Sequence, residues 1–354
     1  MGYRFDPWLI FAVLVILGAS ILNLGYLDTG LVGRQLLWMA LGLGVMLVAS
    51  FLDGVALSRL AFPAWIAAVA ALAGVLAFGT VRGGTRGWFA LGGFTIQPSE
   101  FARLTVVLAL AALAARVPGT RLGVKDVALL GAAAGIPVLL VLAEPDFGVA
   151  ATYLPILGVV LWIGGLPRAA WVILLLCGLV GAAVAWQWVL ADYQKERVLT
   201  VLDPSRDPYG AGYQVRQSKI AVGSGELVGM GFGRGGQSGL RFLPARHTDF
   251  AFAVWAEATG FVGSLALLGA YAVLLWRIAR IALGVADRFG LLLSASVFAW
   301  IAFEVVVNVG MVVGWLPTTG ITLPLFSYGG SSLVSTLAAI GMVQGVWRHR
   351  MVNR

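Results

Sequence analysis

Four pairs of polar residues lie at or inside long apolar runs of the sequence, where a charge is costly unless it has a partner or faces water. They are Glu100 with Arg103, Glu144 with Asp146, Asp249 with Glu257, and Glu304 with Asn308. A carboxylate in such a place can take a proton from a reacting group, bind a cation or complete an ion pair. The candidate functional residues are therefore mainly acids.

Asp249 is the candidate for the reactive residue. It follows Arg246 and His247 where a polar loop ends and a helix-length apolar run begins, and Glu257 lies about two turns further on. A carboxylate at such a boundary can act as a general base. The alternative is an aspartate that caps the helix start, which is the commonest use of that position.

Two other pairs are spaced for one face of a helix. Glu100 and Arg103, three residues apart, predict an ion pair that either lines a substrate site or holds helices together. Glu304 and Asn308, four apart inside a span, either line a pathway or hydrogen-bond between helices.

Glu144 and Asp146 flank Pro145 between two apolar runs. A polar turn explains this pattern. The two acids could equally bind a divalent cation such as magnesium or manganese, although two carboxylates without a fixed frame do not define a metal site.

The sequence lacks the patterns of several other classes of site. It has two histidines and no HExxH, P-loop or Ser-His-Asp spacing. The stretch 231–236 fits the letters G-x-G-x-x-G, but no strand precedes it, so dinucleotide binding is excluded. Cys177, the single cysteine, excludes a disulfide framework.

Basic residues accompany Asp249 in the long polar segment that precedes it. They are Arg216, Lys219, Arg234, Arg241 and Arg246. Cations of this kind hold phosphate groups, while a nearby carboxylate can take a proton. The combination suits an anionic lipid with a polar head on the outer leaflet.

The composition is that of a membrane protein. The 354 residues are 60% hydrophobic and 11% charged, with a mean hydropathy of +0.93, and no soluble domain of this size could bury so much apolar surface. The net charge of +8 lies mostly in short connections between apolar runs. This placement indicates membrane topology and not a nucleic-acid partner.

Ten apolar runs are long enough to span a bilayer. They lie at about 8–27, 33–52, 59–79, 98–116, 127–143, 147–166, 168–190, 249–283, 288–314 and 327–348. They predict an all-α polytopic membrane protein, a single domain over 1–354, with a large outer loop at about 191–248 between helices 7 and 8. We expect one or two short helices in that loop, and a bend near Gly260 and Gly263 in the overlong eighth span.

Lysines and arginines near the span ends predict the orientation in the membrane. Most of them collect on one face of the predicted topology, and only Arg34, Arg82 and Arg86 lie on the other. Both termini are therefore expected in the cytoplasm and the long loop outside.

Several separated motifs resemble the SEDS family of cell-wall proteins. They are RGGTRGWFALGGFTIQPSEFARL, EPDFG, LDPSRDPYGAGYQVRQSKIAVGSG, FLPARHTDFAFAV and LPTTGITLPLFSYGGSS, in this order from about Arg82 to the C-terminus. The RHTDF and QSKIA forms look more like the cell-elongation branch of the family than like its cell-division branch.

The resemblance implies a peptidoglycan glycosyltransferase of the cytoplasmic (inner) membrane that polymerises lipid II at the outer face during cell elongation. The implied partners are lipid II, a class B penicillin-binding protein that crosslinks the product, and other membrane proteins of the elongation complex. A lipid II flippase and a non-catalytic scaffold are the alternative hypotheses. An essential acid at the outer boundary favours the polymerase.

The resemblance also implies roles for individual residues. The acid of the family's HTDF motif is essential and is Asp249 here, while its other functionally sensitive positions fall on Glu100, Arg103 and Asp146. Arg103 stands where the family usually has lysine, and Ala258 replaces the second acid of its common AEE form. The expected substrate-binding residues are Glu100, Arg103, Asp146, Lys219, Arg246 and Glu257.

The bond to be made implies a mechanism. Lipid II carries its sugar α-linked to a diphosphate, whereas the glycan strand is β-1,4-linked, so a single displacement with inversion is the economical route. By analogy with inverting glycosidases, a carboxylate removes the proton of the attacking 4-hydroxyl. Asp249 is the expected base.

Overall fold

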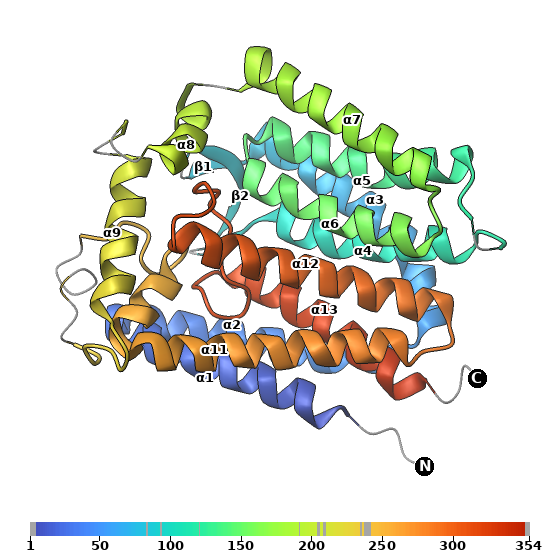
Figure 1. Ribbon diagram of the computed structural model, residues 1–354. Coiled ribbons are helices and arrows are strands. Elements are labelled where there is room, and N and C mark those ends of the chain that lie inside the picture. Colours follow the sequence, from blue (N-terminus) through green and yellow to red (C-terminus); the bar gives the residue numbers. More distant parts are fainter. Residues whose placement is uncertain are drawn as a thin grey trace.

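Long helices dominate the computed structural model, which describes residues 5–82, 84–92, 94–119, 121–190, 192–203, 206–207, 210–233, 236 and 242–350. In this part of the chain, ten long helices lie side by side (Figure 1). They are α1 (Pro7–Leu27), α2 (Thr29–Ala49), α3 (Gly54–Phe78), α4 (Pro98–Ala115), α5 (Val124–Ala143), α6 (Phe147–Ile163), α7 (Arg168–Val184), α11 (Ala251–Leu283), α12 (Arg288–Val312) and α13 (Gly330–His349). They overlap the ten apolar runs, so the predicted all-α, multi-pass architecture is confirmed.

Eight helices of the described chain are long and apolar enough to cross a membrane. Of the other two, α6 is shorter, with 17 residues. The helix α13 has 20 residues and carries several serines and Gln344, yet most of its residues are buried against neighbouring helices. A helix that is covered by protein needs no continuous apolar surface, which explains its polar side chains.

Aspartates fix the start of four membrane helices. Asp6, Asp28, Asp53 and Asp287 are the N-caps of α1, α2, α3 and α12, and each side chain accepts a hydrogen bond from a backbone N–H of the first turn. Asp6 is also fully buried and pairs with Arg277, which fixes α1 to α11.

Short elements cover the end of the molecule opposite its termini (Figure 1). The helices α8 (Asp192–Leu202) and α9 (Ala211–Ser224) confirm the short helices expected in the long loop. The strands β1 (Thr80–Arg82), β2 (Thr85–Leu91) and β3 (Phe94–Ile96) form an antiparallel sheet in the order β1-β2-β3. The sequence did not predict this sheet, because strands of 3 to 7 residues among glycines resemble turns.

The helix α11 is broken at Gly260, where the sequence predicted a bend. Gly260 has φ 67° and ψ −162°, a conformation that other residues rarely adopt. The segment 225–231 supplies the hydrogen bonds that the break removes: Met230 N–H donates to the Glu257 carbonyl at 3.0 Å, and Phe261 N–H donates to the Glu226 carbonyl at 2.9 Å. The long loop is therefore hydrogen-bonded to the backbone of α11 at this break.

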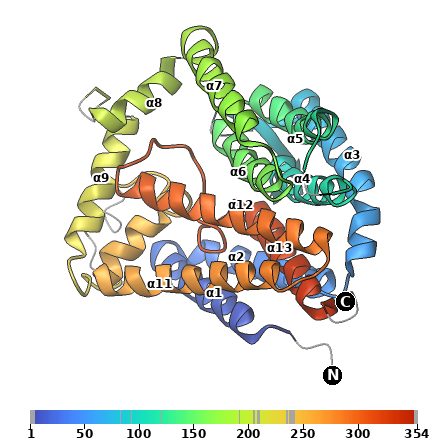
Figure 2. The same ribbon diagram turned by 45° about the vertical axis from the view of Figure 1, so that its right-hand side comes forward.

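The helix α7 lies at the edge of the bundle, whereas α12 and α13 lie near its middle (Figure 2). None of the residues of α7 is buried. It ends in a π-helical turn, Ala185–Val189, before α8 begins. The helices α4, α6 and α12 contact one another, α13 contacts α4 and α12, and these four helices position the candidate site.

The orientation of this fold in the membrane is the first prediction. With Cys177 replaced by serine, a membrane-impermeant thiol reagent added outside should label a cysteine at Arg206, which is half-exposed after α8, and not one at Arg121. Ser205 beside it lies outside the described residues. Labelling of Arg121→Cys alone would place the site on the cytoplasmic face.

Candidate active site

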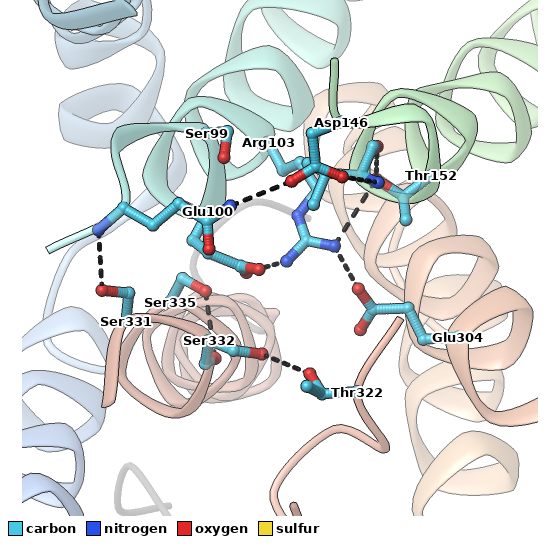
Figure 3. A network of polar contacts seen from close by, with 12 residues as sticks. Ser99, Glu100, Arg103, Asp146, Thr152, Glu304, Thr322, Ser331, Ser332 and Ser335 are labelled. Atoms are coloured by element: carbon cyan, nitrogen blue, oxygen red, sulfur yellow. Dashed lines mark hydrogen bonds and ion pairs between the residues drawn. The ribbon is translucent and has the colours of Figure 1, made fainter. Parts of the chain in front are cut away.

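Arg103 of α4 is the centre of a buried polar network (Figure 3). Its guanidinium pairs with Glu100 of the same helix and with Glu304 of α12, and it lies over the Trp300 ring, 4.8 Å from the centroid. All three charged side chains are buried. The predicted Glu100–Arg103 pair is confirmed, and Glu304 joins it because a guanidinium can serve two carboxylates at once.

Gln97, at the start of α4, connects this network to Asp146. Its backbone N–H donates to Ser331 Oγ of α13 at 3.0 Å, and its side-chain amide donates to Asp146 Oδ2 at 3.0 Å (Figure 3). Asp146 is the N-cap of α6, because its Oδ1 accepts from Val149 N–H at 3.0 Å. One carboxylate therefore orients α6 and faces the start of α4.

Glu144, two residues before this cap, is fully buried. Neither of its carboxylate oxygens has a hydrogen-bond partner among the described residues. Burial, helped by the nearby charge of Asp146, raises the pKa of Glu144 to about 8. Glu144 is therefore protonated near neutral pH. Oε2 lies 2.6 Å from where a Cβ on Gly87 would stand, so the carboxyl packs closely against β2.

Hydrogen bonds to the backbone fix the position of Asp249, and its side chain does not cap α11. The cap position of α11 is Phe250, and no side-chain capping bond is present there. Asn308 Nδ2 donates to the Asp249 carbonyl at 2.9 Å and to the Ile321 carbonyl at 2.7 Å. Ser327 Oγ donates to the Thr248 carbonyl at 2.6 Å. The capping alternative does not describe this structure.

The Asp249 carboxyl lies in a charged environment. Burial raises its pKa, and the negative charge of Asp146 raises it as well. A hydrogen bond with Thr248 and the positive charge of Arg197 act in the opposite direction. Since the pKa stays above its usual range, Asp249 has the property that a general base requires.

Lys219 and Arg246 make separate contacts in the outer region. Lys219 of α9 crosses Gly314, at the turn that follows α12, so closely that a Cβ there would collide with it. Arg246 donates to the Leu27 carbonyl at the end of α1, at 3.4 Å. Their predicted contacts with substrate stay predictions.

Glu257 is buried on α11 beside Gly225, where the segment 225–231 packs against that helix. Burial there is consistent with a structural role, and its predicted role in substrate binding stays a prediction. Arg234 and Arg241, two of the basic residues noted in the sequence, lie outside the described residues.

The acids of the described chain do not form a metal site of their own. No three His, Cys, Asp or Glu side chains come together as ligands in the described ranges. These residues do not fit a protein-held magnesium or manganese ion, and the expected cation stays a prediction.

The sequence did not predict that Arg197 contacts the loop between α12 and α13. Arg197 of α8 donates to the Thr318 carbonyl at 3.4 Å, and its charge acts on Asp249. Nothing in the spacing of the chain links α8 to a loop between α12 and α13. The letters LPTTG indicate a loop after the apolar run and do not indicate which helix contacts it.

The second prediction concerns the buried charges of the network. Arg103→Ala should destabilise the protein by about 3–5 kcal/mol, because it leaves two buried carboxylates without their cation. Thermal unfolding of the purified protein in detergent measures this. Adding Glu304→Gln to Arg103→Ala should recover part of the loss, whereas Arg121→Ala, at an exposed position, should change little. Equal stability of Arg103→Ala and wild type would contradict the ion-pair network.

The third prediction concerns Glu144. Its pKa in the folded protein, about 8, exceeds the ordinary value of 4.5, so the folded state binds more protons between these values and stability should fall as pH rises through this window. Glu144→Gln should remove that part of the pH dependence. Melting temperatures across the window measure it, with the exposed Glu226→Gln as the control. Parallel curves for wild type and Glu144→Gln would show that Glu144 is not buried as an acid.

Comparisons with known proteins agree over nearly the whole chain. Residues 3–352 match the family model described as "Cell cycle protein", that of FtsW, RodA and SpoVE. The chain is 38% identical to peptidoglycan glycosyltransferase MrdB of Escherichia coli K12 over 348 residues, 97% of this chain and 91% of that protein. It is 39% identical to stage V sporulation protein E of Bacillus subtilis over 277 residues, 77% of this chain and 74% of that protein.

Solved structures show the same fold. A chain of a peptidoglycan synthase complex, described for its coordination of polymerization and crosslinking, has a TM-score of 0.85 and 38% identity, with 98% of both chains covered. The rod shape determining protein RodA of Thermus thermophilus has a TM-score of 0.74 and 36% identity, again with 98% of both chains covered. The chain therefore belongs to the SEDS family, the family of FtsW, RodA and SpoVE.

Proposed function

We propose that this protein is a peptidoglycan glycosyltransferase that polymerises lipid II at the outer face of the cytoplasmic membrane during cell elongation. The proposal is based on Asp249. Asn308 fixes the backbone of this residue, and burial raises the pKa of its carboxyl group. The similarity to MrdB, a peptidoglycan glycosyltransferase, and to RodA supports the same activity.

The reaction is a single displacement at the anomeric carbon of the donor sugar. Asp249 takes the proton of the acceptor 4-hydroxyl as its oxygen bonds to that carbon. The bond from the carbon to the diphosphate oxygen breaks on the opposite face, and its electron pair leaves with the diphosphate. The α-linkage of the donor thereby becomes the β-linkage of the strand.

The surroundings of Asp249 suit this step. Asn308 ties the Asp249 backbone to the loop after α12, so the base does not have to be ordered when substrate binds. A raised pKa brings the carboxyl closer to the operating pH, where a base is most effective. Asp146 contributes by its charge, and the Arg103 network holds the helices that carry Asp146 and Glu304.

The partners follow from the reaction. Lipid II is both donor and acceptor, and a class B penicillin-binding protein would crosslink the strand, together with other membrane proteins of the elongation complex. The similar chain from a complex that coordinates polymerization with crosslinking supports this assignment. The distribution of lysine and arginine supports a cytoplasmic position for both termini.

The fourth prediction tests the base. Asp249→Asn preserves size but cannot take a proton, so polymerisation of labelled lipid II by the purified protein, alone and with its partner, should fall about a hundredfold or more. The melting temperature should change little, because the hydrogen bond from Asn308 goes to the Asp249 backbone.

A matched control is Asp203→Asn, which changes an exposed acid at the end of α8. It should polymerise like wild type. If Asp249→Asn makes long glycan strands at a near-normal rate, the base lies elsewhere and Asp146 or Glu257 becomes the candidate. A wild-type protein that moves lipid II across vesicles without polymerising it would instead support the flippase hypothesis.

A further inference from the structure

The loop between α12 and α13 lies against two charged residues and the first turn of α6. Its carbonyl at Thr318 accepts from Arg197 of α8 at 3.4 Å. Its Gly320 is close to Asp249, since a Cβ there would stand 3.9 Å from Oδ2. At Thr319 its carbonyl packs so tightly on Gly148, in the first turn of α6, that a Cβ on that glycine would collide with it.

This loop carries two hydroxyl groups without partners. The Oγ1 atoms of Thr318 and Thr319 are buried and make no hydrogen bond to any described residue. Thr318 as a whole is only 7% exposed. A buried hydroxyl without a partner costs free energy, so such groups in native proteins commonly bond to a ligand or to ordered water. The pair is therefore an independent sign of a polar ligand at this loop.

The charges around the loop determine which ligand could bind there. Asp146 and Asp249 are both acids, and the negative charge of Asp146 acts on Asp249. An anion would be repelled by them unless a cation stood beside it. Arg197 is a cation in this position, because its charge reaches Asp249 and its guanidinium touches Thr318. A guanidinium with adjacent hydroxyl donors matches phosphate oxygens.

We propose that Arg197, Thr318 and Thr319 form a diphosphate seat, which holds the diphosphate of the donor lipid and stabilises it as it leaves. This inference rests on the proposed function for the identity of the donor. When the bond to the anomeric carbon breaks, the diphosphate gains a negative charge, while the proton of the acceptor hydroxyl goes to Asp249. Arg197 stabilises the negative charge on the diphosphate, and Asp249 accepts the proton.

The seat also gives α8 a function. The helix lies between α7 and α9 across the outer end of the bundle (Figure 2). Glu196 of α8 makes an exposed surface pair with Arg206 at 3.6 Å, which contributes little to stability, whereas Arg197 points to the loop after α12. The long loop therefore contributes a cation to a site whose acids come from the membrane helices.

Direct binding tests the seat without relying on turnover. Purified full-length protein is titrated with inorganic pyrophosphate, and separately with undecaprenyl diphosphate in detergent, each with and without MgCl2. Calorimetry and melting temperature measure binding. Wild type and Asp249→Asn should bind, and Arg197→Ala should bind about tenfold to a hundredfold more weakly. Thr318→Val and Thr319→Val should weaken binding severalfold, and Arg206→Ala, a matched arginine next to α8, should bind like wild type.

The two ligands separate the source of the diphosphate. If the protein binds undecaprenyl diphosphate but not pyrophosphate, the lipid chain is needed as well. If it binds both ligands, the diphosphate suffices. Either result supports the seat if binding depends on Arg197. Arg197→Lys, which keeps the charge but not the guanidinium, should bind with intermediate affinity. Wild-type affinity in Arg197→Ala, or no binding of either ligand to wild type, would overturn the proposal.

Activity gives a second readout that a merely structural role would not move. Loss of Arg197 removes a positive charge that lowers the pKa of Asp249, so the acid limb of the pH–activity profile should shift to higher pH in Arg197→Ala. Thr318→Val should lower the rate without moving that limb. If wild type binds diphosphate through Arg197 but never polymerises lipid II, the seat stands and the proposed function fails.

Discussion

The fold depends on keeping charge inside a membrane domain. An unpaired buried arginine would destabilise the fold, and Arg103 is paired with Glu100 on its own helix and with Glu304 on α12. The Trp300 ring covers the guanidinium, and Thr152 of α6 lies within 3.5 Å of it. Because these partners come from α4, α6 and α12, the ion pairs hold the relative positions of three helices.

Those helices in turn fix the outer site. The start of α4 places Gln97 beside Asp146, and the end of α12 places Asn308 beneath Asp249. Asn308 and Ser327 act on the backbone around Asp249, so the side chain keeps its carboxyl for chemistry. The arrangement is typical of reactive groups that are held by neighbours on rigid elements.

Much of this could be predicted from the sequence. Apolar run length located the ten helices, and spacing within one helix found Glu100 and Arg103 because their separation alone brings them together. Contacts between distant segments could not be predicted in this way. Glu304 reaches Arg103 across 201 positions of sequence, and Arg197 reaches Thr318 across 121. The sheet was missed because its short strands are defined by pairing and not by pattern.

The charges around Asp249 come from two different parts of the chain. The acids that define the site, Asp146 and Asp249, would repel an anionic lipid, and Arg103, whose charge acts on Asp146, already pairs with two glutamates. The long loop carries two other cations, Arg197 of α8 at Thr318 and Lys219 of α9 at Gly314. Since both residues contact the same connection between α12 and α13, that connection couples the part that carries the base to the part that carries the cations.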